Sequence, residues 1–327
     1  MLNKLLERQL RRYLKGDGEL SAETNELLLA ISNTYDHFEQ DRTLLERSLE
    51  ISSSELTRAN KKMKEVNRII EEKNKDLTDS INYARMIQEA IFPPQSMVKR
   101  ILPNSFIFYR PKEIVSGDFY WLDEINDRIY LAAVDCTGHG VPGAFMSIVG
   151  QNLLNDAVRE HKLTKPSEIL DWINLGLNKT LRQSSDTNSL RDGMDIAFCC
   201  IDKTDQTIAY AGAYNPMYLF RDGVLLETKA DKFPIGISFR DSISTFKNHE
   251  MKYQKGDVVY IFTDGFPDQF GGPMGKKYKY DRFQTLLKSI HEQSIHEQGQ
   301  ILEKEFWSWK GDLVQIDDIL IIGFTLD

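Results

Sequence analysis

Aspartates follow apolar, strand-like segments at four widely separated places in this 327-residue sequence. They are Asp118 in VSGDFYW (115–121), Asp135 in LAAVDCTGHG (131–140), Asp264 in VVYIFTDGF (258–266), and the pair Asp317 and Asp318 in VQIDDILIIG (314–323). A carboxylate beside a buried strand is costly to remove from water unless it is paired or binds a cation. Several such carboxylates that converge would form an all-oxygen site for a hard divalent metal. The pattern therefore favours metal-assisted hydrolysis over a binding module.

The first 92 residues differ in pattern from the rest of the chain. Gly16 and Gly18 predict a turn after a short first helix, with Ser21 as the N-cap of a long second helix. From residue 45 onward, apolar residues recur every seven positions. One heptad set is apolar throughout: Leu49, Leu56, Met63, Ile70, Leu77, Ala84 and Ile91. Polar residues interrupt the companion set, which is Leu45, Ser52, Ala59, Val66, Lys73, Ser80 and Ile87.

A heptad repeat of this length predicts a coiled coil, most simply a parallel homodimer that the polar companion residues weaken. The alternative is a long amphipathic helix that packs on its own catalytic domain. Pro93 and Pro94 end the helix, because proline is not tolerated in a helix interior. We therefore expect a helical dimerisation and regulatory segment over 1–92 and a separate domain over 95–327.

Short β-rich runs dominate the chain after Pro94. They lie at 105–110, 117–123, 128–135, 195–202, 206–212, 216–221, 224–228, 243–250, 257–263 and 318–325, and helical stretches lie near 142–160, 166–183, 281–292 and 297–309. Asp222 and Gly223 mark a hairpin turn between two of these runs. Successive strands without intervening helices predict antiparallel pairing, and the helices fall in two blocks. The predicted fold class is α+β, an antiparallel β-sandwich flanked by helices.

Composition argues against several classes of function. The formal net charge is −8 and no basic tract stands out, which argues against nucleic acid as a main partner. The sequence has neither a bilayer-length apolar run nor a signal-peptide pattern at its start. Cys136, Cys199 and Cys200 lack metal-ligand spacing, so we interpret them as reduced core thiols. These features together predict a cytoplasmic protein that does not contact a membrane.

Phosphate ester hydrolysis is a reaction that such a carboxylate cluster can support. It is slow without help, because an anionic ester repels an anionic nucleophile. Two divalent ions about 3.5–4 Å apart neutralise the phosphate, lower the pKa of a water molecule and aim it at phosphorus. In such a site we expect Asp135 to bridge the ions, Asp118 and Asp264 to bind one or both, and Asp317 to complete the ligand set.

The motifs SGDF (116–119), DCTGHG (135–140), TDG (263–265) and DD (317–318) resemble those of the metal-dependent serine/threonine protein phosphatases of PPM type. They occur in the family order and are most similar to the bacterial SpoIIE/RsbU-like branch. The resemblance covers about residues 95–327 and implies a double β-sandwich flanked by helices, with two Mn²⁺ or Mg²⁺ ions between the sheets. The residues that match the family's metal ligands are Asp118, Asp135, Asp264 and Asp317, and Cys136 matches a backbone carbonyl ligand.

The resemblance also implies an enzyme that removes phosphate from serine or threonine of small anti-sigma-factor antagonist proteins. Two positions depart from the family pattern. Eukaryotic members place a histidine, the candidate general acid, where this chain has Thr137, so His139 is the remaining candidate proton donor. Eukaryotic members also hold phosphate with an arginine, for which Arg110 and Lys112 are both candidates here.

Simpler interpretations exist for some of these residues. Asp-Gly and Gly-Asp pairs often form only turns at strand ends, and His139 can belong to a local turn. Asp318 competes with Asp317 for one ligand role, and we expect it to bind nearby backbone instead. Asp195 is expected in a turn that enters a strand, with a supporting role beside the site as the alternative.

The helix continues from the heptads into residues 80–92, which resemble a short helix that packs on the phosphatase core in regulated members of the branch. We therefore expect association through the coiled coil, or an upstream regulatory protein, to shift this helix and order the metal site. Two other functions stay open from sequence: a catalytically silent scaffold with the same fold, and a metal-independent carboxylate hydrolase such as a glycosidase.

Overall fold

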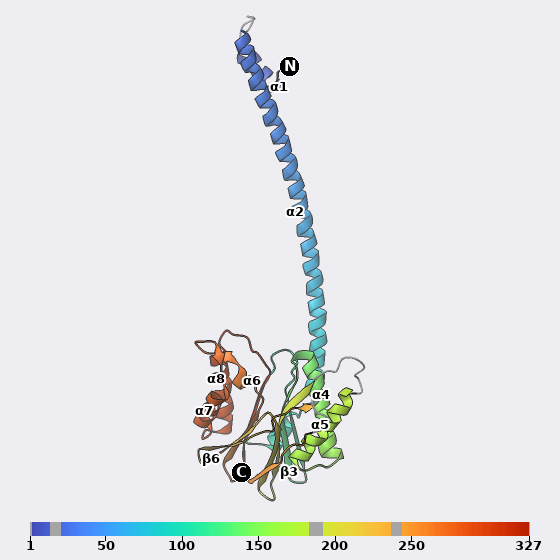
Figure 1. The fold of residues 1–327 in the computed structure, drawn as a ribbon, viewed down its shortest axis with the longest axis vertical. Helices are drawn as coiled ribbons and strands as arrows, with labels where there is room; N and C mark the ends of the chain where they lie inside the picture. Colours follow the sequence, from blue (N-terminus) through green and yellow to red (C-terminus); the bar gives the residue numbers. More distant parts are fainter. Residues whose placement is uncertain (1, 14–20, 183–191, 237–243, 327) are drawn as a thin grey trace. The chain divides into compact units, whose positions relative to one another are not determined.

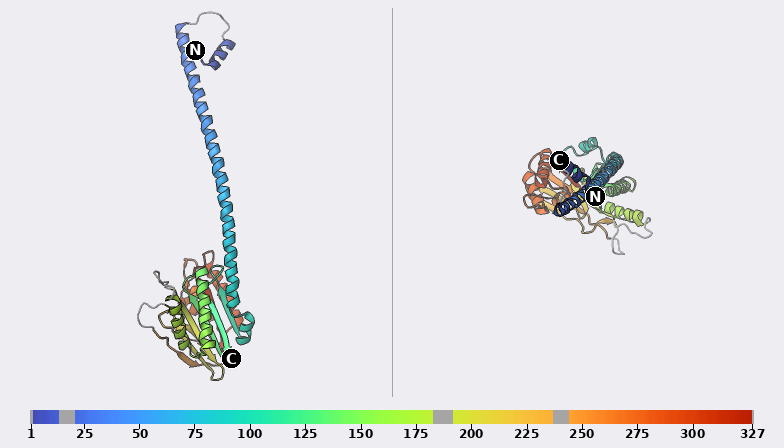
Figure 2. Two further views of the ribbon diagram at one scale, coloured as in Figure 1. Left: turned by 90° about the vertical axis from the view of Figure 1, so that its right-hand side faces the viewer. Right: turned by 90° about the horizontal axis from the view of Figure 1, so that it is seen from above.

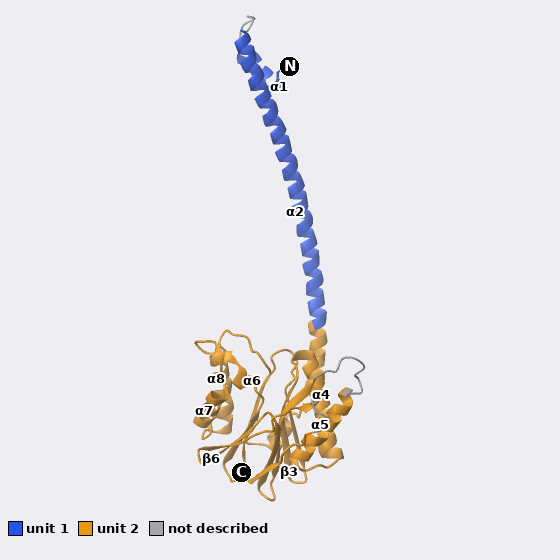
Figure 3. Ribbon diagram, in the orientation of Figure 1, with its two compact units in different colours: residues 1–77 blue, residues 78–327 orange. Residues whose placement is uncertain are grey.

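The computed structural model describes residues 2–13, 21–182, 192–236 and 244–326. The chain forms two compact units, residues 1–77 and 78–327, and their division falls inside one long helix (Figure 3). The turn predicted at Gly16 and Gly18 lies outside the described residues. The second unit begins upstream of the boundary expected at Pro93 and Pro94, because the end of the long helix contacts its core through Gln88.

The first unit consists of α1 (Lys4–Tyr13) and most of α2 (Ala22–Ile91). The Ser21 hydroxyl accepts a hydrogen bond from the Thr24 N–H at 3.2 Å, which confirms Ser21 as the N-cap of α2. The Asn3 N–H donates to the Ser32 hydroxyl at 2.7 Å, so the start of the chain is fastened to α2. Helix α2 runs for 70 residues, as the sequence predicts for this region.

One apolar stripe of α2 is exposed in the single chain. It contains the first heptad set from its beginning to the end of the first unit: Leu49, Leu56, Met63, Ile70 and Leu77. Exposed apolar surface of this extent is typical of an interaction site. Pairing with a second helix stays a prediction, and this stripe is the surface that such pairing would bury.

The second unit contains two large antiparallel sheets. The five-stranded sheet has the order β1 (Ser105–Arg110), β13 (Ile319–Leu326), β10 (Asp257–Phe262), β6 (Met217–Arg221) and β7 (Val224–Thr228). The six-stranded sheet has the order β2 (Phe119–Ile125), β3 (Arg128–Cys136), β4 (Gly193–Asp202), β5 (Thr207–Ala213) and β9 (His249–Lys252), with β8 (Ile235–Gly236) beside β4. A small hairpin pairs β11 (Phe270–Gly271) with β12 (Lys276–Lys277).

Helices cover the outer faces of both sheets. Helices α4 (Gly140–Asn155), which continues as a π-helical turn over Asp156–Glu160, and α5 (Pro166–Arg182) cover the six-stranded sheet, and the left view of Figure 2 looks onto them. Helices α7 (Tyr280–Ile290) and α8 (Ile295–Lys310) cover the five-stranded sheet, and the short α6 (Gly265–Asp268) lies beside them (Figure 1).

Three apolar clusters correspond to this order of layers. One lies between α4–α5 and the six-stranded sheet, one between the two sheets, and one between the five-stranded sheet and α7–α8. Strand alternation explains the arrangement, because every strand that is covered on both faces contributes side chains to two clusters. The predicted α+β sandwich flanked by helices is confirmed.

Some elements differ from the sequence prediction. Helix α3 (Gln95–Ile101) follows directly after Pro94, because a proline that ends one helix also has the φ angle that starts another. The strand expected over 243–250 is the shorter β9, and residue 243 lies outside the described residues. Cys136, Cys199 and Cys200 are buried free thiols, as predicted. No described helix combines the length and apolarity that a membrane span requires.

Candidate metal centre between the sheets

Strand alternation directs three aspartates into the space between the sheets. Successive side chains of a strand point to opposite faces, and Leu131 and Ala133 of β3 belong to the core between the sheets. Asp135 has the same parity and faces the same space. Asp195 lies directly opposite Asp135 in the β3–β4 register. Asp118, just before β2, also has the parity of the inner face and is buried.

The five-stranded sheet supplies the other acidic residues. The Thr263 hydroxyl, directly after β10, donates to Asp118 Oδ2 at 2.6 Å and so joins the two sheets. Asp264 comes next, at the start of α6, and Asp317 lies in the loop before β13. Both act electrostatically on Asp135. The structure therefore brings the four predicted ligand aspartates together from four separate segments.

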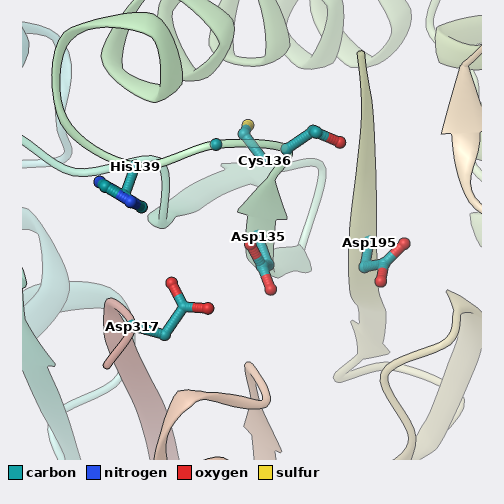
Figure 4. A pocket seen from close by; sticks show the side chains of 7 residues that line it. Asp135, Cys136, His139, Asp195 and Asp317 are labelled. Carbon is teal, nitrogen blue, oxygen red and sulfur yellow. The ribbon is translucent and has the colours of Figure 1, made fainter. Parts of the chain in front are cut away.

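A cavity of about 270 Å³ opens among these residues (Figure 4). Its lining is Asp135, Cys136, Thr137, Gly138, His139, Asp195 and Asp317. Figure 4 shows the carboxylates of Asp135, Asp195 and Asp317 around one space, with the Cys136 thiol turned away from them. That thiol belongs to the core beneath α4 and α5. The Cys136 atom expected to act as a ligand thus remains the backbone carbonyl oxygen.

Burial and mutual repulsion raise the pKa values of these carboxyl groups. Burial raises the pKa of Asp118 well above its usual value, and the charge of Asp135 adds to this effect. Burial also raises the pKa of Asp135, with further repulsion from Asp264, Asp317 and Asp195. Mainly through burial, the pKa of Asp264 rises to about 6 and that of Asp195 to about 7. A positive charge placed among them would reverse these shifts.

The chemistry of this donor set fits Mn²⁺ or Mg²⁺. Hard divalent cations prefer carboxylate and carbonyl oxygens, and the cavity is several times larger than the volume of about 30 Å³ that one water molecule occupies in the liquid. Within the described part of the chain, no three histidine, cysteine, aspartate or glutamate side chains lie close enough together to hold a metal ion by themselves. Asp135, Asp195 and Asp317 line a space that is large enough for ions together with water.

Glycines allow the loop that carries Asp118 to approach the loop that follows β3. A Cβ atom on Gly117 would lie 2.6 Å from the Gly138 carbonyl oxygen and 3.0 Å from that of Cys136. A Cβ atom on Gly143 would collide with the same Gly138 oxygen. Larger residues would push the two loops apart, so these glycines are needed for the close approach of the site's two halves.

Thr137 and His139 have different roles in this loop. The Thr137 N–H donates to the Gly193 carbonyl at 2.9 Å, and the Gly193 N–H donates to the Thr137 hydroxyl at 3.0 Å. Thr137 therefore fastens the loop to β4 beside Asp195. His139 lines the cavity, and its Nδ1 lies 2.6 Å from Glu113 Oε1. Both side chains are half exposed.

The structure distinguishes between Arg110 and Lys112, the two basic residues considered for phosphate binding. Arg110 Nη2 lies 2.5 Å from Glu303 Oε1 of α8, so its guanidinium group is paired on the helix side of the sheet. The Lys112 N–H donates to Asp318 Oδ1 at 2.7 Å, and the Lys112 charge acts on Asp317. Lys112 is therefore the basic residue that is connected to the acidic site.

Asp318 binds backbone, as expected from its sequence. Its Oδ1 accepts from Lys112, and its Oδ2 accepts the Gly117 N–H at 2.7 Å. The side chain is buried. Asp318 thus holds the loop before Asp118 against the loop that carries Asp317.

Gln88, near the end of α2, is a residue that sequence reasoning missed. Its buried side chain donates through Nε2 to the Ser116 carbonyl at 2.6 Å and to the Ser147 hydroxyl at 2.8 Å. Its Oε1 accepts the Ser116 N–H at 3.2 Å. Gln88 therefore binds both backbone polar groups of the residue two positions before Asp118. Because Ser116 is 28 residues away in the chain, no local pattern could show this contact.

We expect the metal-free protein to lose stability as pH rises from about 5 to about 7. In this window unfolded aspartates are already ionised, since their usual pKa is about 3.9. Folded Asp264 and Asp195 still bind protons, with pKa values of about 6 and about 7. The folded state then binds more protons than the unfolded state, so the free energy of unfolding falls with pH. Urea denaturation of the EDTA-treated protein measures this slope.

Asp195→Asn is the control for this titration, because an amide cannot take up the proton. We expect a shallower slope in this variant and a higher stability of the wild type at neutral pH when Mn²⁺ is added. A wild-type stability that rises with pH over this range, or an identical slope in Asp195→Asn, would contradict the prediction.

Known proteins resemble this chain in sequence and in fold. The family described as Stage II sporulation protein E (SpoIIE) matches residues 125–327. The phosphoserine phosphatase RsbU of Bacillus subtilis (strain 168) is 29% identical over 158 residues, which are 47% of this chain and 44% of RsbU. The chain thus aligns with less than half the length of this curated relative.

Solved structures agree with the sequence match. The SiaA-PP2C domain of Pseudomonas aeruginosa superposes with a TM-score of 0.70 at 31% identity, over 78% of this chain and 98% of that domain. The PP2C phosphatase domain of SpoIIE from Bacillus subtilis, solved with a fragment of its regulatory domain, superposes with a TM-score of 0.56 at 18% identity, over 68% of this chain and 63% of that one. The match to more than half of the chain shows that this protein belongs to the SpoIIE family, with a PP2C-type fold in its second unit.

Proposed function

We propose that this protein is a metal-dependent phosphoserine/phosphothreonine protein phosphatase of bacterial cytoplasmic signalling. The observation that supports this most strongly is the convergence of the partly buried carboxylates of Asp135, Asp195 and Asp317 in one cavity, with the buried Asp118 beside them. The curated relative RsbU, named as a phosphoserine phosphatase, supports the same reaction. The proposed reaction hydrolyses a phosphate monoester to a free hydroxyl group and inorganic phosphate.

In this proposal the ligands of two Mn²⁺ or Mg²⁺ ions are Asp118, Asp135, Asp264, Asp317 and the carbonyl of Cys136. When bound, such ions supply positive charge that offsets the phosphate and activates water for attack on phosphorus. Thr263 orients Asp118 through its 2.6 Å hydrogen bond to Oδ2, which fixes that carboxylate oxygen.

The rim of the cavity supplies groups for the phosphate and for the leaving oxygen. The backbone N–H of Lys112 is anchored by Asp318, and the Lys112 ammonium group is the proposed partner of the phosphate oxygens. His139 lines the cavity with its imidazole oriented by Glu113, and it is the proposed proton donor to the leaving serine or threonine oxygen.

The proposed substrate is a phosphorylated protein of the anti-sigma-factor antagonist type. The motifs that resemble the SpoIIE/RsbU-like branch support this choice.

Helix α2 has two proposed roles. Its exposed heptad stripe pairs with a second copy of the chain, which forms a parallel coiled-coil homodimer. Its last turns, which hold Ser116 through Gln88, carry changes in association or contact with an upstream regulatory protein to the loop of Asp118. Because α2 is one continuous helix, a rotation at one end reaches the other.

Asp135→Asn is expected to lower Mn²⁺-dependent hydrolysis of p-nitrophenyl phosphate by more than about 100-fold. Removal of a residue that only hydrogen-bonds to a metal ligand typically lowers metal affinity or activity about 10–100-fold. Asp135 is a proposed ligand itself, so its loss should have a larger effect. Asp202→Asn is the matched control, because Asp202 is a buried aspartate at the other end of the same sheet. Wild-type hydrolysis that is absent, or unaffected by EDTA, would contradict the proposal.

Ile70→Asp is expected to convert a dimer of the full chain into a monomer in sedimentation analysis. A charge in the centre of an apolar seam costs several kcal/mol, which weakens association by about 100-fold or more. Lys75→Asp introduces the same side chain at a heptad position that faces away from the seam, and it should leave the dimer intact. A monomeric wild type, or dissociation in both variants, would exclude the proposed seam.

Gln88→Leu is expected to raise the Mn²⁺ concentration needed for half-maximal activity about 10-fold, since it removes the hydrogen bonds that place the loop before Asp118. Glu89→Leu changes the neighbouring exposed residue and should leave the Mn²⁺ requirement as in the wild type. Identical metal requirements in the Gln88 variant and the wild type would show that this contact does not influence the site.

A further inference from the structure

Gln269 lies where the segments that carry Asp264 and Asp317 meet. It follows α6, and its side chain is fully buried. Its Nε2 donates to the Val314 carbonyl at 2.9 Å, and its Oε1 accepts the Ile316 N–H at 3.2 Å. The amide group therefore binds two backbone groups of the loop that leads into Asp317. The remaining Nε2 hydrogen bond goes to the Phe270 carbonyl at 2.9 Å.

The backbone of Gln269 is held from the opposite side. Its carbonyl accepts the Tyr278 N–H at 2.9 Å and Trp309 Nε1–H of α8 at 3.1 Å. The two aromatic rings pack edge to face with centroids 5.1 Å apart. The position of Gln269 is thus set by α8 and by the hairpin of β11 and β12. The backbone of Gln269 is therefore held by groups outside the loop that its side chain binds.

The same two segments also touch at a second place. A Cβ atom on Gly265 would collide with the Asp318 carbonyl oxygen, so the two backbones are in contact there. The Asp318 carboxylate fastens this end of the loop to the Lys112 and Gly117 N–H groups. Between these anchors, Gln315 makes hydrogen bonds to the Arg110 and Asp317 carbonyls at the exposed surface. Gln269 is the buried side chain that holds the other end of this stretch.

We propose that Gln269 is a positioning residue that sets the placement of Asp317 relative to Asp264, and thereby the affinity of the site for divalent ions. This inference rests on the proposed function. Gln269 contacts neither the cavity nor the proposed ligand atoms and acts through the backbone from Val314 to Asp317. Residues that orient metal ligands in this indirect way typically contribute about 10–100-fold to metal affinity.

The chain offers a matched control in Gln298 of α8. Gln298 is as buried as Gln269, its Nε2 donates to the His291 and Gln293 carbonyls at 3.0 and 2.9 Å, and its Oε1 accepts the Tyr260 hydroxyl. None of these partners lies in the Asp317 loop. Gln269→Leu and Gln298→Leu therefore remove the same number of buried hydrogen bonds at two different places. Gln269→Asn keeps the amide on a side chain that is one methylene group shorter. It replaces Gln269→Leu as the test variant if Gln269→Leu does not fold.

Two measurements on the full chain test the inference. Hydrogen exchange of the metal-free protein reports whether residues 311–318 are held, and calorimetric titration with Mn²⁺ reports affinity without any assay of activity. We expect faster exchange of this segment and about 10-fold weaker Mn²⁺ binding in Gln269→Leu, and a smaller effect in the same direction in Gln269→Asn. Gln298→Leu should keep the wild-type exchange of the segment and the wild-type Mn²⁺ affinity.

Wild-type Mn²⁺ affinity in the Gln269 variants, or an equal loss in Gln298→Leu, would overturn the inference while the proposed function stands. A wild-type chain that binds no Mn²⁺ would overturn both. The two failures are distinguishable, because the first appears only in the variants and the second appears in the wild type.

Discussion

The fold must remove several acidic side chains from water between its two sheets, and this requirement constrains the segments around them. Folding brings Asp118, Asp135, Asp195, Asp264 and Asp317 out of water and near one another, and their pKa values rise in consequence. Without a cation this arrangement opposes folding, because each ionised group is disfavoured by burial and by its neighbours. The apolar clusters on both sides of each sheet must therefore stabilise the site as well as the fold.

Short contacts hold the acidic groups in place against this repulsion. Thr263 joins the two sheets at Asp118, Asp318 binds the loop before Asp118, and Thr137 fastens the loop after β3 to Gly193. Each contact links segments that are far apart in sequence. A proposed divalent ion would replace the repulsion by attraction, so the same geometry that is unfavourable when empty becomes a strong site when loaded. This trade of stability for function is typical of active sites.

The end of helix α2 and the residue after it contact the segments around Asp118 through a polar side chain and an aromatic one. Gln88 reaches Ser116, and Phe92 packs against Tyr109 and Tyr120 with ring centroids 5.9 and 5.6 Å apart. The Tyr109 hydroxyl donates to the Asp118 carbonyl at 3.2 Å. The end of α2 therefore contacts the backbone at Ser116 through Gln88, and Phe92, directly after α2, is linked to the Asp118 carbonyl through Tyr109. In the proposed regulation by α2, association through the coiled coil would shift the end of α2 slightly, and this shift would move the backbone at Ser116.

Local sequence patterns predicted much of this fold, and the exceptions have a common cause. The aspartates that converge between the sheets could be selected because each lies in a short motif, and the strands could be placed because apolar residues mark them. Their role as ligands stays a prediction. The sequence alone could not decide whether Asp195 lies beside the site, because the strand register sets it opposite Asp135. Arg110 and Lys112 could not be separated, because the partner of Arg110 is Glu303 on a distant helix. Gln88 and Gln269 likewise act on remote backbone that periodicity does not reveal.

Anomalous diffraction from crystals soaked in Mn²⁺ shows whether the acidic residues between the sheets bind divalent ions. We expect two manganese peaks among the carboxylates of Asp118, Asp135, Asp264 and Asp317. A map without anomalous density between the sheets, or with manganese only at sites elsewhere on the chain, would contradict this expectation.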